Sequence, residues 1–177
     1  TTYANDHDDQ YRCVISAVGA ATPATTNAVV LTVQRTFSIT AQPSNATANE
    51  GATANFTVTV STSSGSPTYQ WERSDDGGAN YASIGSATSA TYTTPTLVFA
   101  NDNADRYRVV ASLVGAAASI TSTYGELTVL RVISIGTQPA STAVIEGGQG
   151  TFNIVASITS GVISYPVSYT HLTLPTS

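Results

Sequence analysis

The stretch Thr68-Tyr69-Gln70-Trp71-Glu72-Arg73 holds the only tryptophan of the 177 residues and decides the fold class. Tyr69 and Trp71 alternate with Gln70 and Glu72, so an extended segment here has one aromatic face and one polar face. The next residues, 74–78, read Ser-Asp-Asp-Gly-Gly, a composition typical of a tight turn because Asp and Gly tolerate positive φ. The pattern predicts a central β-strand whose tryptophan is buried in a core.

The same alternation with a period of two extends on both sides of this strand. Upstream, four apolar residues alternate with polar ones: Ala54, Phe56, Val58 and Val60. Downstream, strands are predicted around three segments: residues 90–94, 106–114 and 119–130. No stretch shows the i, i+3, i+4, i+7 apolar spacing of a helix, and Pro or Gly recurs at intervals typical of a sandwich. The sequence therefore predicts an all-β sandwich.

The charge balance argues against nucleic acid as a partner. Six cationic residues stand against eleven acidic ones, which gives a net charge of -5. All six cations are arginines, and only Arg106 and Arg108 lie close together, whereas binding to phosphates needs clustered positive charge. The chain also has no apolar run of about 18 residues, so no membrane segment is predicted.

The sequence repeats itself at an offset of 96 residues without a slip in register. Of the 69 pairs formed by residues 1–69 and 97–165, about 28 are identical. Matching stretches include Ala4-Asn5-Asp6 with Ala100-Asn101-Asp102, Leu31-Thr32-Val33 with Leu127-Thr128-Val129, Gln42-Pro43 with Gln138-Pro139, and Tyr69 with Tyr165. Identity at this level in one register predicts a tandem array with one folding unit per period.

The repeat divides the chain into one complete unit and two partial ones. Residues 1–34 correspond to the end of a unit, residues 35–130 to a complete unit, and residues 131–165 to the beginning of a third. Cys13 is the single cysteine, so no disulfide can form within the chain. Stability is therefore predicted to come from packed apolar cores.

Three features of the complete unit carry a family resemblance. Trp71 lies on the predicted third strand, Tyr107 precedes the inward position Val109 by two residues, and Leu127-x-Val129 closes the unit. Together they resemble the immunoglobulin-like (Ig-like) domains of bacterial and phage surface proteins. The resemblance implies that Tyr107 is a tyrosine corner, whose hydroxyl bonds to a nearby backbone group.

The resemblance also bears on the cysteine. In disulfide-bonded members, two cysteines occupy the places of Phe56 and Val109, which are apolar here. Apolar side chains fill the same core space, so the fold is expected without the disulfide. Cys13 stands 96 residues before Val109. If its partner position holds Phe, as at positions 56 and 152, Cys13 is expected to be a buried free thiol rather than half of a bridge.

The repeat ends at Tyr165. It predicts Gln-Trp at positions 166 and 167, but the chain continues with Pro166-Val167-Ser168. Residues 166–177 resemble the in-frame translation of a transposase sequencing adaptor, which indicates a non-native tail from an environmental DNA assembly. On this interpretation His171 is not a biological residue.

Little in the remaining sequence supports catalysis. Without the tail, His7 is the sole histidine, which leaves no base for a Ser-His-Asp arrangement and no His-rich metal site in the complete unit. Four aspartates could in principle form a glycosidase-like pair: Asp75, Asp76, Asp102 and Asp105. They fall in predicted turns, where acidic residues are solvated or form the turn. No catalytic or cofactor-binding residue is predicted, and the chain is expected not to be an enzyme.

Calcium is the remaining candidate ligand. Two aspartates precede the Tyr-Arg strand in each copy: Asp6 and Asp9, and Asp102 and Asp105. Calcium takes six to eight oxygen ligands, and Asn101 or Asn103 could add to the carboxylates. We favour a helical or Asx turn capped by aspartate, so no metal site is predicted. Residues 74–81 are similar to the Asp-box hairpin, which is a folding turn.

Two functions remain. The favoured one is a non-enzymatic Ig-like module of a large phage virion or bacterial cell-surface protein. Such a module would act as a spacer, as a decoration or as a weak binder of surface glycans or proteins, and its partners would include neighbouring repeats. The alternative is an accessory domain of a secreted carbohydrate-active or proteolytic enzyme. Both place the chain outside the cell, and both rest on analogy of fold.

Overall fold

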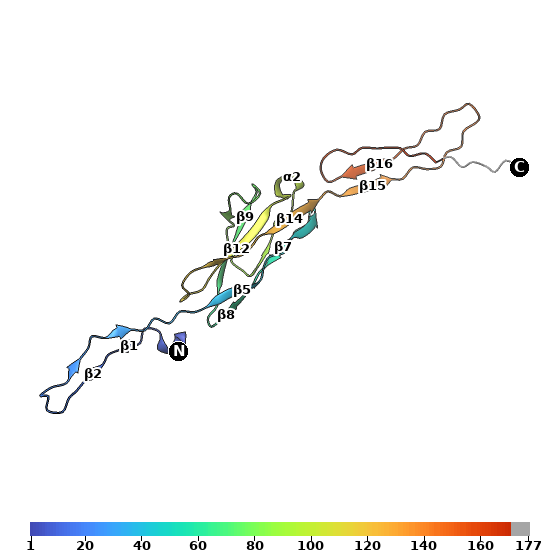
Figure 1. Cartoon of the computed structure of the whole chain (residues 1–177). Helices are drawn as coiled ribbons and strands as arrows, with labels where there is room; N and C mark the ends of the chain where they lie inside the picture. Colours follow the sequence, from blue (N-terminus) through green and yellow to red (C-terminus); the bar gives the residue numbers. More distant parts are fainter. Residues whose placement is uncertain (171–177) are drawn as a thin grey trace.

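A computed structural model describes residues 1–170 of the chain, which form an elongated all-β molecule (Figure 1). A sandwich occupies the middle, and a narrow two-stranded ribbon extends from each of its ends. The predicted non-native tail, residues 166–177, falls mostly outside the described residues, as does His171. That interpretation stays a prediction.

The larger sheet of the sandwich is built around the tryptophan strand. Its strand order is β10-β9-β12-β14-β6, and β13 also pairs with β12. The members are β6 (Ala46–Asn49), β9 (Thr68–Ser74), β10 (Ala82–Ser83), β12 (Arg106–Ser112), β13 (Ile120–Thr121) and β14 (Gly125–Leu130). The β9 and β12 strands pair antiparallel over seven residues, with Val109 opposite Trp71. Only the β14 and β6 pair is parallel.

The second layer consists of two short antiparallel pairs. They are β11 (Thr91–Thr93) with β7 (Asn55–Thr57), and β5 (Phe37–Ala41) with β8 (Thr59–Thr62). A helical turn, α2 (Phe99–Asp102), connects β11 to β12 across the end of the sandwich. This two-layer arrangement is an Ig-like β-sandwich, as the sequence predicts.

The core between the layers is aromatic. Trp71 is fully buried and its indole N–H donates to the Ser89 carbonyl over 2.9 Å, so burial leaves no unpaired donor. The Phe56 ring stacks on Tyr107 with centroids 4.5 Å apart and lies 6.5 Å from Trp71. Phe56 belongs to one layer and Tyr107 to the other, so these contacts join the two sheets. The predicted burial of Trp71, Phe56 and Val109 is confirmed.

Two predicted strands are interrupted. The segment 119–130 is not one strand, because residues 122–124 separate β13 from β14. Ser122 marks the break: its N–H still donates to the Val109 carbonyl, but its buried hydroxyl accepts the Val109 N–H in place of a backbone acceptor and donates to the Thr123 carbonyl. Val58 likewise separates β7 from β8, and its N–H donates to the Ala90 carbonyl.

Gly125 begins β14 at a close contact with Phe56 of the other layer. A Cβ at this position would lie 2.5 Å from the Ser44 carbonyl oxygen and 2.9 Å from a ring carbon of Phe56. Only glycine fits this contact without a shift of backbone or ring.

The N-terminal ribbon has strand pairings that match those of β12 with β13 and β14. It contains α1 (Tyr3–Asp6), then β1 (Gln10–Tyr11) paired with β4 (Val29–Val30) and β2 (Val14–Ile15) paired with β3 (Ala24–Thr25). Gln10 pairs with Val30 just as Arg106 pairs with Glu126, and Val14 pairs with Thr25 just as Val110 pairs with Thr121. Each of these pairs is shifted by 96 residues from its counterpart.

The C-terminal ribbon has a ladder that matches the β5 and β8 ladder at the same offset of 96 residues. It pairs β15 (Ile133–Thr137) with β16 (Val155–Ile158). Ile133 pairs with Ile158 as Phe37 pairs with Thr62, and both ladders carry an irregularity after their third residue. Three pairs of glycines with positive φ recur at this offset along the chain: Gly19 with Gly115, Gly51 with Gly147, and Gly65 with Gly161.

The expectation for Cys13 is wrong. Its thiol is free, as expected, but the residue is exposed rather than buried. The backbone around it matches that of Val109: the N–H of Cys13 donates to Thr26 Oγ1, as that of Val109 donates to Ser122 Oγ. No second layer lies over the N-terminal ribbon within residues 1–170, so a core position here faces solvent.

Candidate functional site

The acidic loop before β12 is held by an arginine from β9. Arg73 Nε lies 2.5 Å from Asp105 Oδ2, and Arg73 Nη2 lies 3.5 Å from Asp102 Oδ1. The second oxygen of Asp102 accepts the Val98 N–H over 2.7 Å and so caps α2. In the other copy, Asp6 accepts the Thr2 N–H in the same way. The interpretation of a helical turn capped by aspartate is confirmed for both copies.

Asp105 departs from the expectation that the loop aspartates are solvated or form turns. Its side chain is buried, and that burial raises the pKa of its carboxyl, although Arg73 acts in the opposite direction. Asn103 is also engaged, since its side-chain oxygen accepts the Val129 N–H over 2.9 Å. Both carboxylate oxygens of Asp102, one of Asp105 and the side-chain oxygen of Asn103 are therefore engaged by the protein itself.

The tyrosine-corner prediction fails in one detail. Tyr107 is buried, but its hydroxyl lies 3.4 Å from Asp105 Oδ2 and donates to that carboxylate, not to a backbone group. Burial and the neighbouring carboxylate both raise the pKa of Tyr107, so the phenol stays protonated as the donor. The resemblance implies a backbone acceptor for this hydroxyl. Here the buried carboxylate of Asp105 takes that place.

The Asp-box-like segment is a folding turn, as predicted. Asp76 Oδ1 accepts the Ser74 hydroxyl over 2.7 Å and the Asn80 N–H over 2.9 Å, while Ser74 Oγ accepts the Gly78 N–H. Gly77 and Gly78 both have positive φ, the conformation for which the Gly-Gly pair was expected. Asp76 Oδ2 accepts the side-chain N–H of Asn80, so both carboxylate oxygens of Asp76 are used to shape the turn.

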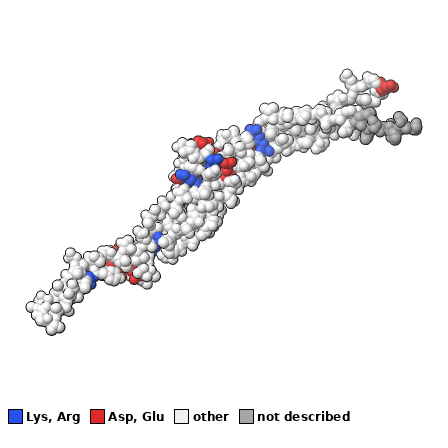
Figure 2. Space-filling model, in the orientation of Figure 1, with Lys and Arg blue, Asp and Glu red and all other residues white. Residues whose placement is uncertain are grey.

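Charged side chains gather over one part of the sandwich (Figure 2), and four of them form two ion pairs on the outer face of the larger sheet. On strand β12 the arginines alternate with buried residues, so Arg106 and Arg108 project away from the core. Arg108 Nε lies 2.7 Å from Glu72 Oε2, and Arg106 Nε lies 3.0 Å from Glu126 Oε2. Sequence alternation places these residues on one face, but their pairing required the register of the three strands.

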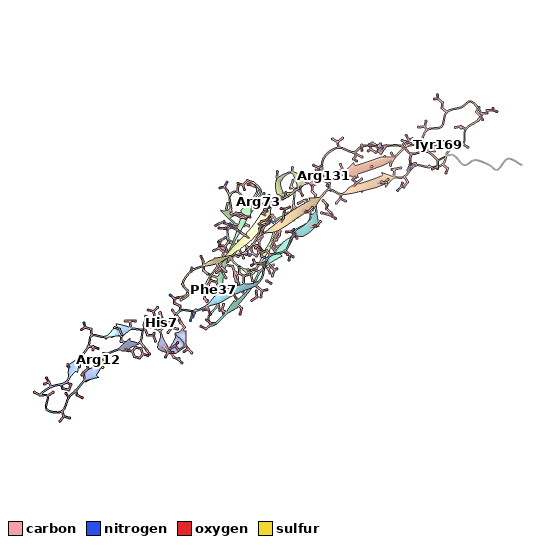
Figure 3. The ribbon with its side chains drawn as sticks, in the orientation of Figure 1. His7, Arg12, Phe37, Arg73, Arg131 and Tyr169 are labelled. Carbon is pink, nitrogen blue, oxygen red and sulfur yellow. The ribbon has the colours of Figure 1, made fainter. Side chains whose placement is uncertain are left out.

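Aromatic side chains complete this charged face. The guanidinium of Arg108 lies 3.8 Å from the ring centre of Tyr81, and that of Arg106 lies 4.4 Å from the ring centre of Tyr124. Arg73 follows Glu72 on β9 (Figure 3), but alternation places its side chain on the opposite face of the strand, where it pairs with Asp105. Each arginine of the face thus has an acidic partner, so the face suits polar and stacking contacts rather than capture of an anion.

Residues 1–170 show no other arrangement with recognisable chemistry. No three His, Cys, Asp or Glu side chains among them are placed to hold a metal ion. His7 is the only histidine in this part, and its Nδ1 accepts the Val33 N–H. None of the helices described there has the length and apolar composition needed to cross a membrane.

One family model matches the sandwich and identifies the family of this chain. A model described as "Domain of unknown function (DUF8696)" matches residues 38–131, which is more than half of the chain. The chain belongs to the DUF8696 family. The matched DUF8696 segment contains all the buried core residues of the sandwich, together with the acidic loop and the charged face.

Solved structures similar to this DUF8696 protein contain immunoglobulin domains. A chimeric titin Z1Z2-Z1Z2 tandem carrying a GRGDS peptide from fibronectin is 23% identical, with a TM-score of 0.40. Sidekick-1 immunoglobulin domains 1–5 are 14% identical (TM-score 0.44), and Dpr2 Ig1-Ig2 in complex with DIP-Theta Ig1-Ig3 is 19% identical (0.40).

The chain covers only part of each of these structures. The alignments span 63%, 80% and 73% of this chain, but 60%, 30% and 43% of the respective solved chains. A search of curated proteins finds no match.

Proposed function

We propose that this chain is part of a non-enzymatic tandem array of Ig-like units that extends or decorates the surface of a phage virion or bacterial cell. Residues 35–130 are one complete unit, and residues 1–34 and 131–165 belong to its neighbours. Ig-like domains generally have structural or adhesive roles, and a spacer needs only a stable, repeatable unit.

The observation that carries this proposal is the recurrence of local structure at an offset of 96 residues. Strand pairings, helical turns and positive-φ glycines recur in one register on both sides of the sandwich. Backbone bonds recur as well: Asp8 N–H donates to the Leu31 carbonyl as Ala104 N–H does to the Leu127 carbonyl. The register of the sequence repeat therefore coincides with a repeat of local backbone structure, as in repeat proteins.

The charged face supports a second, adhesive part of the role. The residues that differ between copies include those that build this face: Arg106, Tyr124 and Glu126 correspond to Gln10, Ala28 and Val30. Core residues such as Tyr107 and Leu127 are kept as Tyr11 and Leu31, whereas these three outward residues vary. Weak contacts to surface glycans or proteins would use this face, whose Arg and Tyr side chains suit polar and stacking contacts.

The proposal is tested by how length grows with copy number. Residues 35–130 would be joined as one, two and three copies in the native register, and the maximum dimension measured by small-angle X-ray scattering. An array of docked units adds the same increment with each copy. Matched chains with a Gly-Ser insertion after Leu130 should add less with each copy, as flexibly joined units do. Compaction of the native-register chains would contradict a spacer role.

A further inference from the structure

The linker between successive units contains an arginine that contacts both sides of the junction. At the first junction, the Arg35 guanidinium lies 3.9 Å from the ring centre of Tyr3 in α1. At the second, Arg131 lies 3.8 Å from the ring centre of Phe99 in α2 (Figure 3). Arg35 and Arg131 are 96 residues apart, as are Tyr3 and Phe99. The same cation–π contact therefore occurs twice in the described chain.

The other side of each arginine meets the unit that follows. A Cβ at Gly65 would lie 2.8 Å from Arg35 Nη1, and a Cβ at Gly161 would lie 3.1 Å from Arg131 Nη1. Both glycines lie in the loop that follows the second strand of each unit's first ladder, β8 or β16. Glycine leaves room for the guanidinium between this loop and the aromatic ring.

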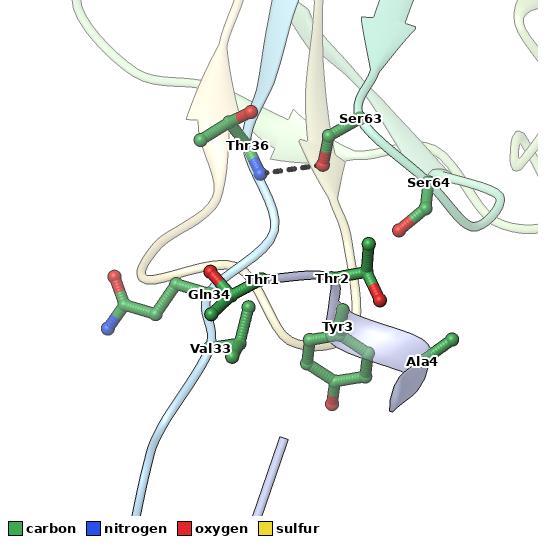
Figure 4. Close-up of a pocket in the computed structure, with 9 residues that line it drawn as sticks. All are labelled: Thr1, Thr2, Tyr3, Ala4, Val33, Gln34, Thr36, Ser63 and Ser64. Atoms are coloured by element: carbon green, nitrogen blue, oxygen red, sulfur yellow. Dashed lines mark hydrogen bonds between the residues drawn. The ribbon is translucent and has the colours of Figure 1, made fainter. Parts of the chain in front are cut away.

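At the first junction, the helical turn of the preceding unit also rests on the following one. Arg35 Nη1 donates to the Val114 carbonyl over 2.9 Å, and its backbone N–H donates to the Gly115 carbonyl. A Cβ at Gly115 would lie 2.4 Å from the Tyr3 ring, so the ring packs directly on this backbone. Beside this contact is a hollow of about 370 Å³, lined by Tyr3 and Val33 on one side and by Ser63 and Ser64 on the other (Figure 4).

At the second junction, a carboxylate adds a further link. Arg131 Nε donates to Ser160 Oγ over 3.1 Å, and that hydroxyl donates to Glu50 Oε2 over 2.7 Å. The other oxygen of Glu50 accepts the Phe99 N–H over 3.0 Å. Hydrogen bonds from Thr159, Ser160 and Phe99 hold the pKa of Glu50 below its usual value, so the link is intact at neutral pH.

We infer that the linker arginine, the aromatic residue of the preceding turn and the glycine of the following loop form the docking interface between successive units, with the next unit as its partner. This inference rests on the proposed tandem array. A planar guanidinium suits the role because it stacks on a ring and donates from its edge at the same time. The interface fixes the angle between neighbouring units, which makes the array stiff rather than freely jointed.

The test uses the full chain and its single exposed thiol. Cys13 lies in the N-terminal ribbon, and a second cysteine introduced as Thr88→Cys lies on the complete unit, where Thr88 is exposed. Spin labels on both would report the distribution of distances across the first junction by pulsed electron paramagnetic resonance. The unsubstituted junction should give one narrow peak. Arg35→Ala and Tyr3→Ala should each cause loss of this peak in favour of a broad distribution.

Two matched controls separate loss of the junction contact from the effect of any substitution of an aromatic residue or of a stacked arginine. Tyr3→Phe should leave the peak unchanged, because Phe99 occupies the same place at the second junction. Arg108→Ala removes an arginine that also stacks on a tyrosine, Tyr81, but within one unit, and should leave the peak unchanged as well.

Each outcome decides the inference. A broad distribution for the unsubstituted junction, or a narrow peak that persists in Arg35→Ala and Tyr3→Ala, would overturn it. Neither result would contradict the proposed tandem array, because that proposal is tested separately by the length added with each copy. Conversely, a narrow peak that broadens only in the junction variants would support docking even if joined copies failed to lengthen as an array should.

Discussion

At the scale of single residues, Trp71 has the largest expected effect on stability. Its side chain is 0% exposed, contacts both layers and donates its N–H to Ser89. Removing a buried Trp typically costs about 3 to 5 kcal/mol, against a total domain stability of roughly 5 to 15 kcal/mol. We expect Trp71→Ala to unfold the middle unit or nearly so, as measured by urea denaturation followed by far-ultraviolet circular dichroism.

An exposed aromatic residue of the same unit provides the control. Tyr124→Ala should change the unfolding free energy by no more than about 0.5 kcal/mol, because the side chain lies on the surface. The folded wild type should also show blue-shifted tryptophan fluorescence that is shielded from solvent quenchers. Red-shifted, readily quenched emission would mean that Trp71 is not in the core.

Two aspartates of the middle unit should give opposite dependences of stability on pH. The Asn80 N–H, followed by the Ser74 hydroxyl and the Asn80 side chain, lowers the pKa of Asp76 below its ordinary value of 3.8. Stability from Asp76 is thus fully present above that value and is lost as pH falls through the lowered pKa. Burial raises the pKa of Asp105, so stability at that site decreases as pH rises from 3.8 through the raised value.

Thermal melts between pH 2 and pH 7 would separate the two effects. Asp76→Asn should lower the melting temperature at neutral pH and weaken the loss of stability in acid. Asp105→Asn should remove the opposing trend, in which stability falls as pH rises above about 4. If Asp76→Asn left the loss of melting temperature in acid unchanged, the turn at Asp76 would not be the source of that pH dependence.

At the scale of elements, the acidic loop is expected to be indifferent to calcium. Asp105 and Asp102 already pair with Arg73, and Asp102 also caps α2, so a cation would have to displace internal bonds. Only a ligand that prefers the native state raises its melting temperature. We expect millimolar calcium to leave the melting temperature of the chain unchanged relative to a sample with chelator. A clear upward shift would show that the loop binds calcium despite these bonds.

Alternation and turn composition predicted most elements of the middle unit, but not how its polar groups pair. Trp71, Phe56 and Val109 are buried where their spacing places them, because a period of two is a local property of a strand. The break at residues 122–124 and the burial of Asp105 depend on partners 13 and 32 positions away, Val109 and Arg73. A local pattern does not specify such partners, and the resemblance supplied a backbone acceptor for Tyr107 that the fold does not use.

At the scale of the whole molecule, the two ribbons expose faces that the sandwich buries. Phe152 is 66% exposed whereas its counterpart Phe56 is 1% exposed, and Tyr11 is 52% exposed whereas Tyr107 is 2% exposed. The ribbons lie at opposite ends of the molecule, so they cannot close on each other within one chain (Figure 1). Exposed apolar faces and unpaired strand edges favour association with another copy.

In the proposed array, the N-terminal ribbon of one chain corresponds to the closing half of a unit, and the C-terminal ribbon of another chain corresponds to the opening half. Docking of these halves is a heterologous contact, which propagates into rings or filaments. Counterparts of β9, β10 and β11 are absent from both halves, so the contact should be weak. We expect the sedimentation coefficient of the full chain to rise over a hundredfold range of concentration, while residues 35–130 alone stay monomeric.

One substitution distinguishes specific docking of the two ribbons from nonspecific apolar association. Val29 stands where the complete unit has Gly125, whose missing Cβ allows Phe56 and the Ser44 carbonyl to approach. In a docked pair, Val29 would meet Phe152 of the second copy and oppose the contact. Val29→Gly should therefore strengthen association, although it removes exposed apolar surface and would weaken a nonspecific contact. A full chain that stays monomeric at every concentration, or a Val29→Gly chain that associates less, would contradict docking of the two halves.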